Sequence, residues 1–491
     1  MRGGGVVRFF RDLLGALPRG RSAALFFVAF LFFYIEHFNV FGNPHVMWLC
    51  TGGEWKSGAG LSPLAVIVTC CAFFVLMLFY MRNKFYVSRG MGLVASCALI
   101  ACVPLYWLVA SMTGWGRSFP AGCVILGLYS FGHLCFLPVI VKHLAMVGPT
   151  KALFFYAAVL VCEKTVRPLL LDMPTAFLGL WIAVSPVVVL ICARAAERCA
   201  PVKVELKTNV RTRIPKVLLI TLVVVGVLMG LFSQLESGVV RPPIASVAEA
   251  VIAAGIIVLT FFATRLNFNR LFYLISIPLM VYGVAVLADQ GSPFSLFGFL
   301  VFNFGYDFFY AALWSLYSYL VRYSTFNYYW LPVAGAFGSY LGRAVGILYF
   351  EGCKGELIPG AENAYWLAMV SILFVATLTA ISFYGRNNMK SGWGSVSPHE
   401  ESYSANGFDA SCNAVAAMGG LTVREKNVFM LLAKGNNNKA IAEKLGISPA
   451  TAKTHIKHIY SKLGVHSQQE LIDMVEQNER QAKGSGGAFS L

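Results

Sequence analysis

Apolar residues along most of the chain gather into long runs that are separated by short polar stretches. A run of about 20 apolar residues can cross the roughly 30 Å hydrocarbon core of a bilayer as an α-helix, so each run predicts a membrane-spanning helix. The predicted segments are 22–41, 61–80, 91–111, 119–141, 148–166, 174–193, 215–235, 244–264, 271–288, 294–320, 328–350 and 364–384. We therefore expect twelve spans.

A long polar interruption, RAAERCAPVKVELKTNVRTRIPK at 194–216, leaves six segments on each side. The pattern predicts an all-α membrane bundle with a first half at 22–193, a basic connector at 194–214 and a second half at 215–385. This 6+6 arrangement resembles the major facilitator fold, in which substrate binds near the middle of the membrane between the halves. The loop after the second segment, MRNKFYVSRGMG, has the basic residues of that family's signature but no acidic partner, so transport is the alternative rather than our first expectation.

Composition and charge agree with this interpretation. Hydrophobic residues make up 57 % of the chain and charged residues 13 %, whereas soluble proteins have about 25 % charged residues. Lys and Arg favour cytoplasmic loops. With the N-terminus inside, the inner stretches carry 22 Lys and Arg residues and the outer loops carry six, Lys164 among them. We expect both termini in the cytoplasm, with 1–21 as a lead-in.

The apolar pattern stops before the last hundred residues. Residues 386–420 are rich in Ser, Asn, Gly and Ala and predict a flexible linker. A small helical domain is expected at 421–480, followed by a disordered tail at 481–491. Capping boxes, in which a hydroxyl and a carboxylate bond each other's backbone amides, are predicted at Thr422–Glu425 and Ser467–Glu470.

Helix boundaries are well signalled within this domain. The first helix runs to Ala433, and Asn437 caps a second that ends at Leu445. Ser448 caps a third helix, which Gly464 ends, and a fourth occupies about 468–479. The second and third helices with their tight turn predict a helix-turn-helix, whose second helix enters the major groove of DNA.

The third helix has one apolar and one polar face. Lys453, Thr454 and Lys457 lie on the polar face, where lysine reaches guanine edges or phosphates and the threonine methyl meets thymine. The residues expected to contact the DNA backbone, which fixes register but not sequence, are Thr451, His455, Lys439 and Lys462. A zinc site would need His455, His458 and His466, but no cysteine accompanies them at suitable spacing, so we expect no metal.

The stretch LTVREKNVFMLLAKGNNNKAIAEKLGISPATAKTHIKHIYSKLGVHSQQELI (421–472) resembles the LuxR-type DNA-binding domain of bacterial transcription regulators. The family pattern L-T-x-R-E, A-x-G, I-A-x-x-L-x-I-S, T-x-K-x-H and K-L-x-V is present throughout. The resemblance implies base contacts from Lys453, Thr454 and Lys457, and dimer contacts through the fourth helix. Ala452 stands where the family usually has Val, and Gln468 where it usually has Arg.

Charged residues inside spanning segments are costly and point to function or pairing. Counted along their helices, Glu36, Asp307 and Arg343 reach one level near the middle of the membrane, and we expect Glu36 and Asp307 to contact a ligand. The further ligand candidates are Arg343, His133, Asn303 and Trp314. Alternatively, Asp307 and Arg343 neutralise each other. The stretch GSYLGRAVG predicts a close helix contact through Gly338, Gly342 and Gly346.

The sequence thus predicts a one-component transcription regulator in the bacterial cytoplasmic membrane. Its bundle would sense a small molecule or a membrane state, and its tail would bind promoter DNA as a homodimer and act on RNA polymerase. Membrane lipid would be a further partner. We expect no cofactor and no enzymatic activity, since no nucleophile–base or metal constellation is present. The alternative is a major-facilitator-like permease with a regulatory domain. A disulfide between Cys50 and Cys353 is left open.

Overall fold

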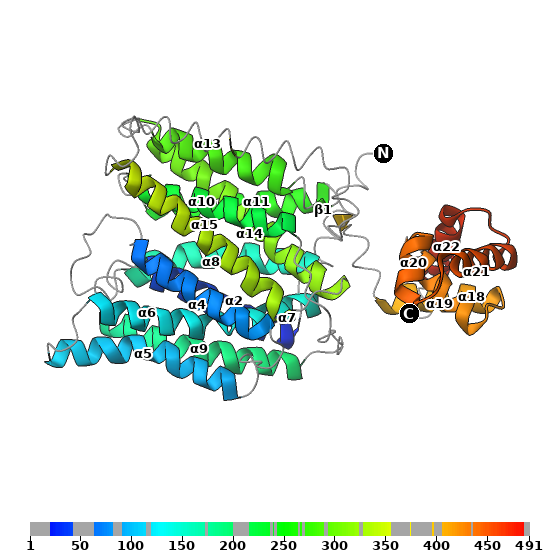
Figure 1. The fold of residues 1–491 in the computed structure, drawn as a ribbon, viewed down its shortest axis with the longest axis horizontal. Helices are drawn as coiled ribbons and strands as arrows, with labels where there is room; N and C mark the ends of the chain where they lie inside the picture. Colours follow the sequence, from blue (N-terminus) through cyan, green and yellow to red (C-terminus); the bar gives the residue numbers. More distant parts are fainter. Residues whose placement is uncertain are drawn as a thin grey trace. The chain divides into compact units, whose positions relative to one another are not determined.

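The computed structural model of the protein forms two compact units, Met1–Pro398 and His399–Leu491, and each is described by itself (Figure 1). The described residues are 20–42, 63–81, 91–113, 119–171, 175–199, 216–235, 239, 243–263, 266–267, 271–288, 293–323, 328–354, 374, 395–396, 405–433 and 436–485.

The first unit is a bundle of α-helices. Its helices are α2 (Arg21–Gly42), α4 (Pro63–Met81), α5 (Met91–Thr113), α6 (Phe119–Leu134), α7 (Leu137–Val147), α8 (Pro149–Leu171), α9 (Thr175–Arg198), α10 (Lys216–Leu235), α11 (Pro243–Ala263), α13 (Ile277–Ala288), α14 (Ser295–Tyr323) and α15 (Trp330–Lys354). A π-helix, η2 (Leu271–Ser276), leads into α13, and the two-residue strands β1 (Leu266–Asn267) and β2 (Ser395–Val396) pair antiparallel. Eleven predicted segments are helical, and the twelfth, 364–384, lies almost entirely outside the described residues.

The predicted segment at 119–141 is two helices rather than one. The α6 helix ends at Leu134, and α7 begins at Leu137 with Pro138 in its first turn, where the missing amide is tolerated. A left-handed glycine, Gly148 with φ of 98°, ends α7 and separates it from α8.

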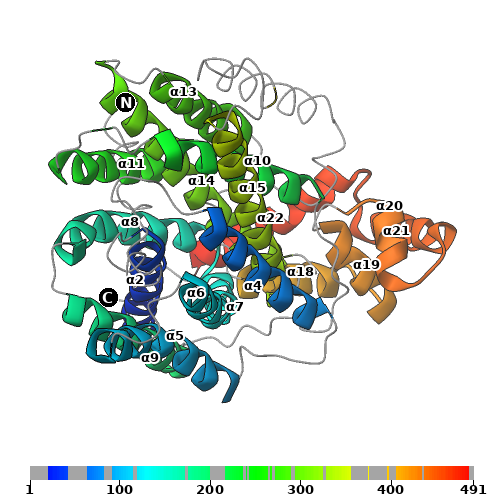
Figure 2. The same ribbon diagram turned by 60° about the vertical axis from the view of Figure 1, so that its left-hand side comes forward.

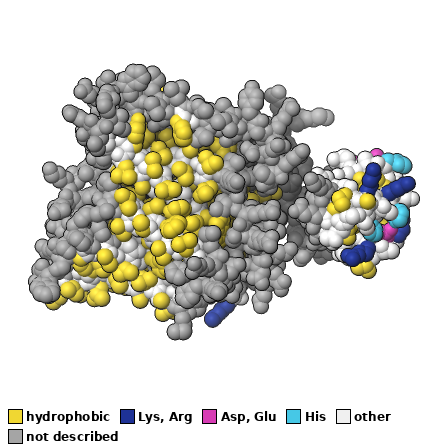
Figure 3. Space-filling model, viewed as in Figure 1, with side chains coloured by type: hydrophobic (Ala, Val, Ile, Leu, Met, Phe, Trp, Pro, Cys, Tyr) yellow, Lys and Arg dark blue, Asp and Glu magenta, His cyan; other side chains and the backbone are white. Residues whose placement is uncertain are grey.

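The bundle exposes large apolar side chains on the face seen in Figure 3. Leu105, Met112, Leu180 and Ile191 are each 60–78 % exposed. Within the described residues, seven helical stretches are long and apolar enough to cross a membrane. A soluble monomer rarely exposes such a contiguous apolar surface, so the protein is a multi-pass membrane protein.

Glycines hold α10 against α15, which lie side by side in Figures 1 and 2. A Cβ atom at Gly342 or Gly346 would collide with the α10 carbonyls of Val223 and Val227, and one at Gly226 would collide with the α15 carbonyl of Ser339. The backbones therefore touch directly, as small residues at four-residue spacing allow. The close helix contact predicted at GSYLGRAVG is confirmed, and its partner is α10.

The second unit is a small helical domain with its own apolar core. Its helices are α18 (Ala405–Met418), α19 (Val423–Ala433), α20 (Asn438–Leu445), α21 (Pro449–Leu463) and α22 (Gln468–Ser485). Phe429, Ile441, Ala452, Ile459 and Leu471 are fully buried at its centre.

The composition of 386–420 predicts a flexible linker, but part of this stretch is the helix α18. Cys412, Val415 and Ala416 recur at helical spacing and are buried in the same core as α19 and α22. Because these are small apolar residues among polar ones, composition alone conceals the apolar stripe. The flexible-linker prediction is therefore wrong for 405–418.

The cap predictions are largely confirmed. The Thr422 amide donates to Glu425 Oε2 at 2.8 Å, and the Glu425 amide donates to Thr422 Oγ1 at 3.3 Å. The Thr451 amide donates to Ser448 Oγ at 3.0 Å. At α22 the Glu470 amide donates to Ser467, but Glu470 accepts from His466 rather than from Ser467, so this box is shifted by one residue.

Candidate functional site

The third helix of the tail domain, α21, presents one face outward. Its inner face buries Ala452 and Ile459, which fixes its rotation against α19 and α20. The turn before it contains Gly446 with φ of 64°, a left-handed conformation that favours glycine. Lys453, Thr454 and Lys457 are all exposed along the opposite face, as the periodicity predicts.

The four residues expected to contact the DNA backbone differ in their positions. Thr451 is exposed and His455 is half-buried on α21, while Lys439 belongs to α20 and its side chain lies outside the described residues. Lys462 is engaged inside the domain, where its ammonium lies 2.7 Å from Glu425 Oε2 and 3.4 Å from the Gly420 carbonyl oxygen. The backbone-contact role predicted for Lys462 thus competes with this ion pair.

Glu425 connects the start of α19 to the end of α21. The hydrogen bond from Lys462 and that from the Thr422 amide lower the pKa of Glu425 from its ordinary value of 4.5 to about 2. The carboxylate is therefore charged at any physiological pH, and it stabilises the angle between α19 and α21.

Gln468 has a structural role that sequence reasoning missed. Its side-chain amide donates to the carbonyl oxygens of Leu432 and Asn436, at 2.8 and 3.1 Å. Leu432 lies in the last turn of α19 and Asn436 shortly after it, where backbone carbonyls lack helical partners. Within the described residues no group of three or more His, Cys, Asp and Glu side chains could hold a metal ion, and His455, His458 and His466 form no such group.

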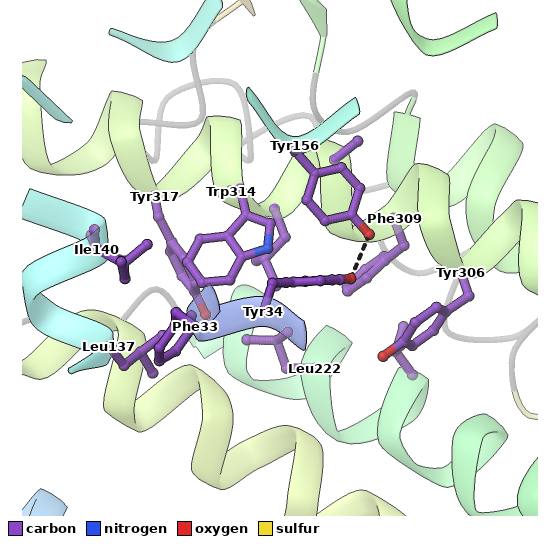
Figure 4. Packing of buried hydrophobic residues seen from close by; sticks show 14 of the residues in the cluster. Phe33, Tyr34, Leu137, Ile140, Tyr156, Leu222, Tyr306, Phe309, Trp314 and Tyr317 are labelled. Atoms are coloured by element: carbon purple, nitrogen blue, oxygen red, sulfur yellow. Dashed lines mark hydrogen bonds between the residues drawn. The ribbon is translucent and has the colours of Figure 1, made fainter. Parts of the chain in front are cut away.

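A cavity opens between the two halves of the membrane bundle. Residues of α2, α4, α6 and α7 line it from the first half, and residues of α14 and α15 from the second. Its empty space, which includes open solvent at its mouth, is about 650 Å³. Its aromatic lining is Phe33, Tyr34, Phe73, His133, Tyr306, Tyr310, Trp314, Tyr317 and Tyr340. Figure 4 shows Phe33, Tyr34 and Trp314 close together, with the Tyr34 hydroxyl turned to Tyr156 at 2.9 Å.

The predicted ligand residues are only partly brought together. His133 and Trp314 line the cavity. Glu36 is buried against α9, where the Ser185 hydroxyl donates to its Oε2 atom. The Asn303 side-chain amide donates to the Phe299 carbonyl of its own helix at 2.9 Å. Neither Glu36 nor Asn303 lines the cavity, because the side chain of each is turned to its own hydrogen-bond partner.

Asp307 belongs to an ion cluster between the halves. Lys164 Nζ on α8 lies 3.6 Å from Asp307 Oδ2 on α14 and 3.7 Å from Glu249 Oε2 on α11. All three side chains are buried or nearly so. The expectation that Lys164 lies in an outer loop is wrong, because α8 continues to Leu171 and carries Lys164 into the bundle. Only the packing of three helices reveals this cluster.

In the part of the chain that the structure describes, Arg343 has no such partner. The alternative that Asp307 neutralises it is wrong, since Lys164 takes that carboxylate. Among the described residues Arg343 forms no ion pair, and its buried Nε atom has no hydrogen-bond partner. The guanidinium instead interacts electrostatically with Tyr306, Tyr310 and Tyr340. The proposed pair Cys50–Cys353 lies outside the described side chains.

Comparison with known families identifies the tail domain. A model of the bacterial regulatory proteins of the luxR family matches residues 420–475. This segment is a LuxR-type helix-turn-helix domain. The bundle lies outside that match, so the family is shown for the tail and not for the whole chain.

Curated relatives match the LuxR-type domain alone. An HTH-type transcriptional regulator of Mycobacterium tuberculosis is 46 % identical over 55 residues, which are 11 % of this chain and 6 % of the relative. The Fimbriae Z protein of Salmonella typhimurium is 48 % identical over 59 residues, 12 % of this chain and 28 % of the relative. The oxygen regulatory protein NreC of Staphylococcus aureus is 47 % identical over 53 residues, 11 % and 24 % of the two chains. The chain thus spans less than a third of each of these relatives.

The bundle resembles a solved transporter structure. A bacterial homologue of the iron transporter ferroportin, crystallised in an outward-facing state, superposes with a TM-score of 0.52 at 16 % identity. The match covers 74 % of this chain and 99 % of that one. At this identity the likeness shows the fold alone, and the bundle is major-facilitator-like.

Proposed function

We propose that the protein is a membrane-bound one-component regulator of transcription. The observation that carries the proposal is that one chain joins a LuxR-type domain, with Lys453, Thr454 and Lys457 exposed on α21, to a bundle with an apolar outer surface. The domain reads promoter DNA in the major groove, and membrane lipid covers the bundle. Its place is the bacterial cytoplasmic membrane, with both termini on the side where DNA is present.

The bundle supplies the sensing part of this proposal. A ligand in the cavity touches α2 and α6 of the first half and α14 and α15 of the second. Rocking of one half against the other is the usual motion of such bundles. A ligand that binds one arrangement better than another shifts the population toward it.

The helix α18 offers a path from the bundle to DNA. It is the helix that precedes the LuxR-type domain in the chain, and it packs against α22 and α19. We propose that the domain dimerises through α22, as the family resemblance implies, and that a pull on α18 alters this dimer. The DNA-bound dimer then acts on RNA polymerase.

A reporter experiment tests this function. Promoter fragments from the host genome are fused to a reporter and introduced into cells carrying the wild type, Lys453→Ala plus Lys457→Ala, or no copy. The proposal predicts fragments whose expression depends on the wild type and is lost with the double variant, at equal protein level in the membrane. Equal expression with both proteins would contradict it.

A permease with an attached regulatory domain is the second candidate, because the bundle shares its fold with a transporter and contains a cavity. Flux of a compound that the reporter assay identifies, measured in proteoliposomes, separates the two candidates. Reporter activation without flux supports a sensor, whereas concentrative uptake supports the permease.

A further inference from the structure

The cavity combines an aromatic lining with a positive charge beside it, Arg343, which forms no ion pair among the described residues. We propose that it binds a planar aromatic anion, such as an aromatic carboxylate, with the ring among the aromatic side chains and the anionic group directed to Arg343. This inference rests on the sensing role proposed above and gives the chemical class of the molecule sensed.

The lining suits a flat ring. Phe33 stacks on His133 with ring centroids 4.5 Å apart, and Phe73 faces Tyr340 at 4.6 Å. Such side chains offer offset-stacked and edge-to-face contacts to a further ring. Leu313 and Ala336 fill the spaces between them.

Arg343 decides the charge of the ligand. An aromatic cage without other charges attracts cations through its ring faces. Here Ser339 and Tyr340 line the cavity, and Arg343 follows them by one helical turn on α15. The guanidinium also acts on Tyr306 and Tyr310, which belong to the lining. A cation at this place repels a cationic ligand and attracts an anionic one.

The carboxylates of Glu36 and Asp307 already have partners. Glu36 accepts from Ser185, and Asp307 faces Lys164. The lining residue Tyr34 interacts with Asp307. The anionic end of a ligand is therefore turned toward Arg343 and away from Asp307. An unpaired arginine at membrane depth is costly, and a bound anion would offset that cost.

Binding to the full-length protein in lipid nanodiscs tests the proposal. The probes are 3-phenylpropionate, its neutral analogue 3-phenylpropionamide, the aliphatic anion hexanoate and the cation 2-phenylethylammonium, each measured by calorimetry up to about 1 mM, a concentration at which weak sites still register. We expect 3-phenylpropionate to bind at least about tenfold more tightly than the other three, equivalent to about 1.4 kcal/mol.

Two variants test whether Arg343 is the group that attracts the carboxylate of the probe. Arg343→Gln should lower the affinity for 3-phenylpropionate to that for the amide and leave amide binding unchanged, which also shows that the cavity is intact. Arg343→Lys should keep part of the preference. The proposal is overturned if 3-phenylpropionate does not bind, if the amide, hexanoate or ammonium probe binds as tightly, or if Arg343→Gln keeps the preference.

This experiment contains no DNA, so its failure differs from failure of the proposed function. Carboxylate binding without any change in promoter activity would retain the site and refute sensing. Promoter control without carboxylate binding would retain the regulator and refute this ligand class.

Discussion

Lys164 and Asp307, on α8 and α14, face each other across the two halves of the bundle with Nζ and Oδ2 3.6 Å apart. Glu249 on α11 faces the same ammonium at 3.7 Å. One cation thus joins one helix of the first half to two helices of the second. Little water reaches the three side chains, so we expect this contact to help fix the arrangement of the halves.

Replacing Lys164 should destabilise the bundle strongly. Lys164→Met leaves two buried carboxyl groups without a cation. Removing one partner of a buried ion pair lowers the free energy of unfolding by about 3–5 kcal/mol. The measurement is the half-life of the folded protein in nanodiscs at raised temperature. Adding Glu249→Gln and Asp307→Asn to the Lys164→Met variant should restore most of the lost half-life. Lys142→Met breaks the more exposed pair with Glu197 and should cost below about 1 kcal/mol. Equal half-lives for Lys164→Met and Lys142→Met would refute the role of the cluster.

A single methyl group at Gly342 should disturb α10 and α15. Its Cβ would collide with the Val223 carbonyl, so Gly342→Ala should lower the thermal midpoint of the bundle. Gly255→Ala on α11 is the matched control, because its Cβ meets nothing within 4 Å. That control should be neutral or slightly stabilising, as alanine favours helix more than glycine. A similar midpoint for both variants would show that the glycine contact is not required.

Glu425 should stabilise the LuxR-type domain in a pH-dependent way. Its pKa is lower in the folded state, so its contribution is complete above 4.5 and is lost as pH falls toward about 2. Glu425→Gln should destabilise the domain by about 1–2 kcal/mol near neutral pH, since a cap and a charged hydrogen bond are weakened.

Hydrogen exchange of α19 and α21 amides in the full-length protein measures this effect, after correction for the intrinsic exchange rate at each pH. The difference between wild type and Glu425→Gln should shrink as pH falls below 4.5. If the difference in protection between wild type and Glu425→Gln stayed constant below pH 4.5, the effect would come from side-chain packing rather than from the charge of Glu425.

Lys453 and Lys457 should control which sequence is bound. If they contact bases, each alanine variant loses about 1–3 kcal/mol of discrimination between the promoter site and a random duplex. If they contact only phosphates, binding to both duplexes weakens alike. The slope of log affinity against log salt concentration then decreases by about one. Affinity measured at several salt concentrations separates these results, with Lys426→Ala on α19 as the charge-matched control.

Local signals predicted the tail well. The caps at Thr422, Ser448 and Gly464 depend on residues within a few positions, and the outward face of α21 follows from periodicity. The ion pair of Lys462 could not be predicted, because its partner, Glu425, lies 37 positions earlier. The helix α18 was not predicted because Val415 and Ala416 become buried only against helices later in the chain.

Contacts between residues that are distant in the sequence were also not predicted in the bundle. Apolar runs predicted where helices lie, but not how they are rotated. Lys164 and Asp307 meet only because α8 and α14 pack together, whereas a depth count alone offered a ligand or, alternatively, Arg343 as the partner of Asp307. His133 and Trp314 were found as cavity residues, whereas Tyr310, Tyr317 and Tyr340 were not, because nothing in a single helix marks which aromatic side chains face a cavity.

The central claim is that a membrane-embedded protein occupies specific DNA sites. Genome-wide crosslinking and immunoprecipitation of the full-length, membrane-retained protein in its host tests it most directly, beside Lys453→Ala plus Lys457→Ala at equal abundance. The account predicts discrete enriched sites sharing one sequence, all lost in the double variant. Absence of enriched sites, or the same sites in both proteins, would contradict it.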